Sequence, residues 1–134
     1  MSSFSNELKE LFIGRAMQIE RREAGWTLLL GDEFQVSIGG YWRLRDASGI
    51  LVTDLDDGHQ FGLQCPVDAQ ATANSVLSDA TITDTDFDPL TGDLKIFAGR
   101  GLIFEVLTIS MGYETWQLYS AKGFEAAVGN GGLR

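Results

Sequence analysis

The chain has 134 residues, of which 44% are hydrophobic and 10% aromatic, and its formal net charge is −9 at pH 7. This length and composition suit one domain with a packed core. No segment approaches the roughly 18 consecutive apolar residues that a membrane-spanning helix needs. A strongly acidic protein repels nucleic acid and anionic membranes, so we expect neither as a partner.

The N-terminal residues and the cysteine content bear on the compartment. Residues 1–8 contain no basic region followed by an apolar stretch, so we expect no secretory signal and a cytoplasmic protein. Cys65 is the one cysteine and cannot form an internal disulfide. It lies between Gln64 and Pro66, and we expect it to be a small buried hydrophobic side chain and not a nucleophile.

Two segments have the apolar spacing of an amphipathic helix. The first is predicted over residues 5–13, with Gly14 as its stop signal, and the second over residues 68–78, with Pro66 and Asp68 as start signals. The apolar positions are Phe4, Leu8, Leu11 and Phe12 in the first helix and Ala69, Ala73, Val76 and Leu77 in the second.

Alternation of apolar and polar residues predicts four strands after each helix. In the first half these strands lie at 17–20, 26–30 and 34–38 and around Trp42. In the second half they lie at 81–84, 94–97 and 104–106 and around Trp116. Residues 99–101, with the sequence Gly-Arg-Gly, are predicted to form a hairpin turn.

The pattern Trp-x-Leu-x-x-Ala-x-Gly occurs twice, and the elements in front of the two copies follow the same order. A chance likeness between two amphipathic strands is the alternative, but the shared order favours internal duplication. We therefore predict a single α+β domain, residues 1–134, made of two pseudo-symmetric halves, 1–66 and 67–134. Each half would be one helix plus a four-stranded, mainly antiparallel sheet. The repeated residues are Trp42, Leu44, Ala47 and Gly49 in the first copy and Trp116, Leu118, Ala121 and Gly123 in the second.

The negative charge is concentrated in the middle of the chain. Between Asp46 and Leu94 there are ten aspartates and no Lys, Arg or Glu, whereas the rest of the chain has nine acidic and ten basic residues. One interpretation is that these aspartates form turns and helix starts and keep the protein in solution. The other is an acidic face that meets a basic protein. The ten are Asp46, Asp54, Asp56, Asp57, Asp68, Asp79, Asp84, Asp86, Asp88 and Asp93.

The chain has no motif of a nucleophilic or zinc site, and among its many carboxylates no pair stands out as an acid–base pair. His59 is the one histidine, in an Asp-Gly turn context, and one histidine with one cysteine cannot form a zinc site. The spacing Asp84-x-Asp86-x-Asp88 resembles the start of a helix-flanked calcium loop. Such a loop needs glycine at its sixth position and glutamate at its twelfth, where this chain has Pro89 and Lys95. We expect no catalytic residue, no metal and no cofactor.

Removal of divalent metal is therefore expected to leave the melting temperature unchanged. The measurement is thermal unfolding with and without a chelator. A large fall on chelation would instead make Asp84, Asp86 and Asp88 ligands, because a bound ion stabilises the folded state by mass action.

The second half resembles a group of small bacterial proteins. Their C-terminal half reads as an apolar strand, a short loop and then Tyr-Glu-x-Trp-x-Leu, to which residues 102–106 and 112–118 correspond here. Proteins of this kind are found near polymorphic toxin systems, where a small acidic protein neutralises a toxin domain. The resemblance implies no catalytic residue. The element order of both halves also resembles the Whirly type of single-stranded-nucleic-acid-binding fold, but fold analogy does not transfer function.

We therefore expect an immunity protein, not an enzyme, that neutralises a basic bacterial toxin, with a nuclease as the first candidate and its gene adjacent. Acidic side chains would mimic phosphate, steer association and occlude the toxin's basic cleft, and the protein would be a monomer or weak dimer. The alternative is an acidic chaperone or binding module for a secreted effector, which would more often be dimeric and would expose apolar patches. The predicted partner-binding residues are Asp54, Asp56, Asp57, Asp84, Asp86 and Asp88.

Overall fold

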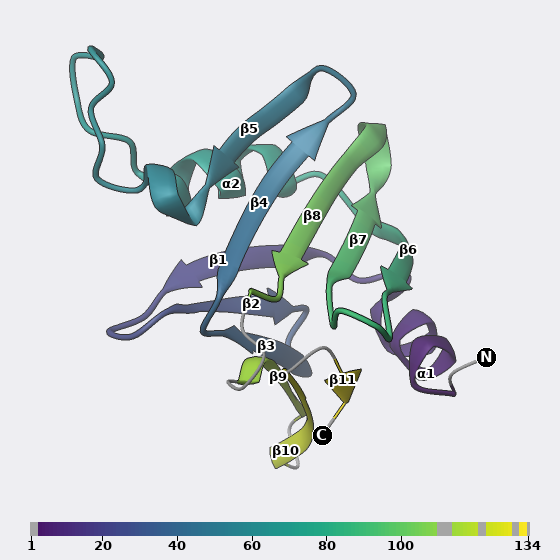
Figure 1. The fold of residues 1–134 in the computed structure, drawn as a ribbon. Coiled ribbons are helices and arrows are strands. Elements are labelled where there is room, and N and C mark those ends of the chain that lie inside the picture. Colours follow the sequence, from purple (N-terminus) through teal and green to yellow (C-terminus); the bar gives the residue numbers. More distant parts are fainter. Residues whose placement is uncertain (1–2, 110–113, 121–122, 130–131, 134) are drawn as a thin grey trace.

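The computed structural model describes residues 3–109, 114–120, 123–129 and 132–133. Two helices and two antiparallel sheets make up this part of the chain (Figure 1), which confirms the α+β prediction. The helices are α1 (Ser3–Phe12) and α2 (Ala69–Leu77), with short 3-10 turns η1 (Asp54–Asp56) and η2 (Gly99–Gly101). The strands are β1 (Met17–Arg21), β2 (Trp26–Leu30), β3 (Phe34–Ile38), β4 (Tyr41–Asp46), β5 (Gly49–Thr53), β6 (Ile82–Phe87), β7 (Leu94–Ala98), β8 (Leu102–Leu107), β9 (Glu114–Ser120), β10 (Gly123–Gly129) and β11 (Gly132–Leu133).

Each sheet combines strands from both halves of the chain. The first sheet has the order β1-β2-β3-β9-β10-β11, and the second has the order β5-β4-β8-β7-β6. The prediction that each half carries its own four-stranded sheet is therefore wrong. The chain crosses between sheets at Gly39-Gly40, where a Cβ on Gly40 would lie 2.5 Å from a side-chain carbon of Thr115. A residue without a side chain lets the chain pass close to β9 here, and the next strand, β4, belongs to the second sheet.

Both repeated tryptophans lie in the core at the seam where the halves meet. Trp42 on β4 is opposite Val106 on β8, and Trp116 on β9 is opposite Ile38 on β3. Each indole is almost completely buried. These registers also place Val36 opposite Leu118 in the same way as Phe104 lies opposite Leu44. Phe104 on β8 therefore corresponds to Val36 on β3.

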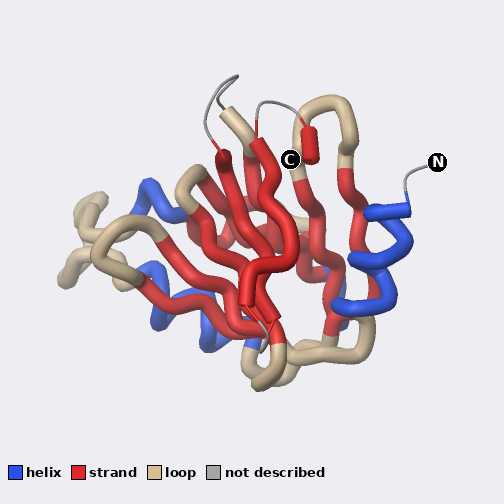
Figure 2. Tube along the Cα trace, turned by 90° about the horizontal axis from the view of Figure 1, so that it is seen from below, coloured by secondary structure: helices blue, strands red, loops and turns tan. Residues whose placement is uncertain are grey.

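Each helix packs against an edge strand, and that strand is the one that directly follows the other helix in sequence. α1 packs against β6, and α2 packs against β1; Figure 2 shows the helices on opposite sides of the strands. Both helices agree with their predicted spans to within two residues, and Asp68 caps α2 by accepting the N–H of Ala71. The predicted apolar faces are buried at Phe4, Leu8 and Phe12 in α1 and at Ala69, Ala73 and Leu77 in α2.

Polar side chains from the helices bond to backbone groups at one outer edge of each sheet, β1 and β6. The amide of Asn74 accepts the backbone N–H of Ile19 at 2.8 Å and donates to its carbonyl at 2.9 Å, so it imitates a neighbouring strand beside β1. Lys9 on α1 donates to the carbonyl of Thr85 on β6. Satisfied edge groups do not recruit another strand, which protects a sheet protein from edge-to-edge association.

Candidate functional site

The structure divides the six predicted partner-binding aspartates between two places. Asp54, Asp56 and Asp57 follow β5, whereas Asp84, Asp86 and Asp88 lie on or just after β6. β5 and β6 are the two outer strands of the second sheet. They are separated by four strand spacings of about 4.8 Å, or roughly 19 Å. The six residues are therefore two separate acidic surfaces.

Each aspartate after β5 has a structural partner. Asp54 accepts the backbone N–H of Trp42 at 3.0 Å, and burial raises its pKa above the usual range although backbone N–H groups bond to it. Asp56 accepts the N–H of Thr53 at 3.0 Å and completes the capping box of η1. The hydrogen bonds from Arg21 lower the pKa of Asp57, which also accepts the N–H of Ala69 at 2.9 Å. These bonds hold the segment from β5 to α2 in a fixed shape.

Asp84, Asp86 and Asp88, on and just after β6, are all exposed. Asp84 pairs with Lys9 on α1 at 2.7 Å, and this hydrogen bond is the main cause of its lowered pKa. Asp86 lies in register with Lys95, and Asp88 accepts the N–H of Leu90 at 2.8 Å in a turn. In the part of the chain that the structure describes, no three His, Cys, Asp or Glu side chains are placed to hold a metal ion together.

A loop at residues 58–67, the projecting loop, extends from the molecule between η1 and α2 (Figure 1, teal). Its neck is closed by two hydrogen bonds, from Gly58 N–H to the carbonyl of Val67 and from Val67 N–H to the carbonyl of His59, both 2.8 Å. Its tip is held by the side chain of Gln60, which donates to the carbonyl of Leu63 at 2.7 Å. The loop thus has internal bonds that fix its conformation.

Exposed apolar side chains gather on and beside the projecting loop. Leu55 is 61% exposed, Phe61 66% and Leu63 56%. Phe61 has a backbone φ of +49°, a conformation that costs energy for a bulky residue. Its ring stacks on His59 with centroids 5.5 Å apart. These apolar residues had no periodic pattern from which a functional role could be predicted.

A groove of about 530 Å³ lies between the projecting loop, β5 and the start of α2. Cys65 is exposed there, so the expectation of a buried cysteine is wrong, because the loop that carries it projects from the core. The sequence signal for such a loop is the pair Gly58 and Gly62, since glycine is the residue that most readily takes the positive φ both have here. The groove is lined by Leu51, Val52, Asp56, Phe61, Leu63, Cys65, Pro66, Val67, Asp68 and Thr72.

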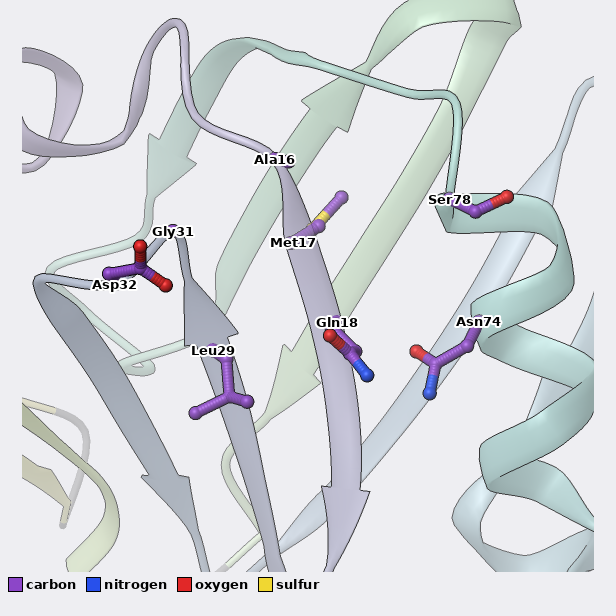
Figure 3. A pocket seen from close by; sticks show the side chains of 8 residues that line it. All are labelled: Ala16, Met17, Gln18, Leu29, Gly31, Asp32, Asn74 and Ser78. Atoms are coloured by element: carbon purple, nitrogen blue, oxygen red, sulfur yellow. The ribbon is translucent and has the colours of Figure 1, made fainter.

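A second groove, of about 420 Å³, lies between α2 and the ends of β1 and β2 (Figure 3). Asn74 lines it, but both polar atoms of its amide are occupied by Ile19. Asp32 is the one titratable side chain among its lining residues. The groove therefore lacks a group of side chains arranged for chemistry, and the projecting loop is the stronger candidate site.

Comparison with protein-family models, with curated proteins and with solved structures gives no match. Among the described residues, no helix has both the length and the apolar character required to cross a membrane.

Proposed function

We propose that this chain is an immunity-type protein that binds and neutralises a basic protein toxin. The observation that carries the proposal is the surface around η1 and the projecting loop. There, carboxylates of Asp56 and Asp68 stand beside exposed Leu55, Phe61 and Leu63. An apolar centre with a polar, charged rim is the usual composition of a protein–protein interface.

The negative charge around the projecting loop indicates a positively charged partner. The projecting loop lies within the stretch from Asp46 to Leu94, which contains ten aspartates and no Lys, Arg or Glu. Arg21 is the nearby cation, and it pairs with Asp57 at 2.7 Å and with Asp68 at 3.3 Å. A partner with a basic cleft, such as a nuclease, would be steered to this surface and occluded by it without any chemical step. The neutralisation would take place in the cytoplasm of the cell that makes the toxin.

We also infer that the chain is a duplicated unit with a pseudo-twofold axis. The bridge between Ala16 and Thr81 joins the segments that lead into β1 and β6. Gly31 N–H donates to the carbonyl of Ala16 and Gly99 N–H to that of Thr81, each at 3.1 Å. The two sheets also have corresponding strand orders, β1-β2-β3-β9-β10 and β6-β7-β8-β4-β5. These paired features support a swap in which the last two of the five strands in each half, β4–β5 and β9–β10, join the sheet of the other half.

An acidic chaperone for a secreted effector is the second candidate, and the exposed apolar residues favour it. The two functions differ in what they do to a partner. An immunity protein abolishes the activity of a folded toxin at equimolar ratio. A chaperone binds an unfolded segment and leaves the released effector active. An activity assay on the product of the neighbouring gene, with and without this chain, separates them.

Neutralising Asp56 or Asp68 is expected to slow association with the basic partner by several-fold and to flatten its dependence on salt. Asn keeps the capping hydrogen bonds that both aspartates make, so Asp56→Asn and Asp68→Asn should fold as the wild type does. Charge reversal of Asp54 or Asp57 is a poorer test, because both carboxylates hold the backbone in place. The measurement is a salt series of binding kinetics against the product of the neighbouring gene.

The matched control is Asp86→Asn on β6, at the opposite edge of the second sheet. It removes the same charge without touching the projecting loop, so its effect on association should be smaller. Equal effects from all three variants would mean that only net charge matters. Rates that respond neither to salt nor to any of the variants would contradict the electrostatic mechanism.

A further inference from the structure

Phe61 is held in an exposed position by the structure of the loop around it. The loop neck is closed by the paired bonds of Gly58, His59 and Val67, and Gln60 crosses the tip to the carbonyl of Leu63. Within this frame Phe61 keeps a φ of +49° while two thirds of it is exposed. A large apolar side chain in a costly conformation on the surface contributes little to folding, and such strain is concentrated at binding sites.

The groove beside Phe61 is lined by both apolar and acidic side chains. Leu51, Leu63 and Val67 supply apolar surface, and Asp56 and Asp68 stand at its rim. Arg21 neutralises part of the charge through Asp57 and Asp68. Asp56 has no cation within ion-pair distance among the described residues. The groove therefore matches an apolar side chain that has a Lys or Arg close to it.

We propose that Phe61 is a preformed aromatic anchor that enters an apolar pocket of the basic partner, while the groove receives an apolar side chain flanked by a cation from that partner. This inference rests on the proposed function, since the partner is the same basic protein. Preformed aromatic side chains bind with little loss of conformational freedom, and buried aromatic anchors usually dominate the affinity of an interface.

The first test compares Phe61→Ala with Leu90→Ala in binding kinetics against the product of the neighbouring gene. Leu90 is 85% exposed in the turn between β6 and β7, away from the projecting loop. Phe61→Ala is expected to raise Kd by about 30-fold or more, mainly through faster dissociation. Leu90→Ala should leave Kd within about twofold of the wild type.

A second variant, Phe61→Gly, separates binding from folding. Glycine adopts positive φ without strain, so its melting temperature should equal or exceed that of the wild type while its affinity falls as for Phe61→Ala. A clear loss of stability in Phe61→Gly would mean that the ring supports the fold, and would overturn its role as an anchor.

Cys65 gives an independent readout of the groove, because it is the one cysteine of the chain and is exposed. Its alkylation rate, followed by mass spectrometry, should fall at least tenfold in the complex if the groove is occupied. An unchanged rate in the complex would overturn the assignment of the groove.

The remaining outcomes separate this inference from the proposed function. If the wild type binds with salt dependence but Phe61→Ala binds equally well, the anchor is overturned and the electrostatic function stands. If the wild type does not bind the basic protein at all, both fail. If the wild type self-associates in sedimentation and Phe61→Ala abolishes this, the occupant is a second copy of the chain, and the assignment to a basic partner is overturned.

Discussion

Replacing Trp116 or Trp42 with alanine is expected to lower the free energy of unfolding by about 3–5 kcal/mol, the range for a large buried aromatic side chain. Trp42 stacks on Phe104 with centroids 5.2 Å apart and meets the edge of Trp26 at the same distance. Trp116 contacts Phe4 and Phe87. Each truncation therefore removes the centre of an aromatic cluster. Urea denaturation measures the loss, and a value below about 1 kcal/mol would contradict the core assignment.

Phenylalanine substitutions at the same positions provide the matched comparison. The indole N–H of Trp116 donates to the carbonyl of Gly92 at 2.9 Å, whereas that of Trp42 is buried with no hydrogen-bond partner in the described part of the chain. Trp116→Phe leaves a carbonyl unsatisfied, at a cost of about 1–3 kcal/mol. Trp42→Phe removes a donor that already lacks a partner, so it should cost less. Equal losses from the two substitutions would show that the hydrogen bond of Trp116 adds no stability.

Replacing Glu105 with glutamine is expected to lower the free energy of unfolding by about 2–3 kcal/mol at pH 7, as for hydrogen bonds to a charged group. One oxygen of Glu105 accepts the Nε–H groups of Arg43 at 2.5 Å and Arg45 at 2.8 Å. The glutamate side chain is only 3% exposed, whereas the two arginines are 38% and 31% exposed. Water therefore still reaches the guanidinium groups in the variant, which keeps the loss below that of a fully buried broken pair.

The loss caused by Glu105→Gln should depend on pH in a defined direction. Burial raises the pKa of Glu105, but the bonds and charges of Arg43 and Arg45 outweigh it, and the pKa lies below the usual 4.5. A carboxylate with a lowered pKa in the folded state stabilises the protein above its unfolded pKa, and this contribution is lost as the pH falls through the folded pKa. The difference between wild type and variant should thus be constant above about pH 5 and shrink below about pH 4.

The control for Glu105 is Glu20→Gln on β1. Glu20 pairs with Arg22 at 2.9 Å, and their side chains are 33% and 48% exposed. Exposed ion pairs contribute about 0–1 kcal/mol, so this variant should be close to the wild type at all pH values. A difference for Glu105→Gln that persisted unchanged at pH 3 would assign its effect to packing and not to charge.

Local structure could be predicted from the sequence wherever a signal lay within one element. The buried faces of α1 and α2 follow from the spacing of their apolar residues, and Asp68 acts as the helix start that its position indicated. The turn at Gly99–Gly101 joins β7 to β8 as predicted, with Arg100 at a φ of +68°. β5, β10 and β11 were not predicted. For β5 the reason is that Val52 is its one buried residue, so this outer strand lacks the alternation of a half-buried strand.

The partners of each strand could not be predicted in the same way. Two successive glycines are compatible both with a hairpin between β3 and β4 and with a crossing between sheets. The structure has the crossing, with Gly40 packed closely against Thr115. The six predicted aspartates belong to one acidic stretch of the sequence, but the structure places them in two groups at opposite edges of the second sheet. Two residues of the resemblance, Gly112 and Tyr113, and one residue of the repeat, Ala121, lie outside the described residues.

The presence in each sheet of strands from both halves of the chain has a consequence for synthesis on the ribosome. β3 pairs with β9, and β4 pairs with β8. Residues near position 36 therefore cannot pair until residues near position 118 have been synthesised. Pairings between such distant segments slow folding, because the connecting chain must lose its freedom before the contacts form. The nascent N-terminal half therefore carries an unpaired strand edge until translation is almost complete. The second sheet can close once β8 (Leu102–Leu107) has been made, whereas the first sheet needs β9 (Glu114–Ser120).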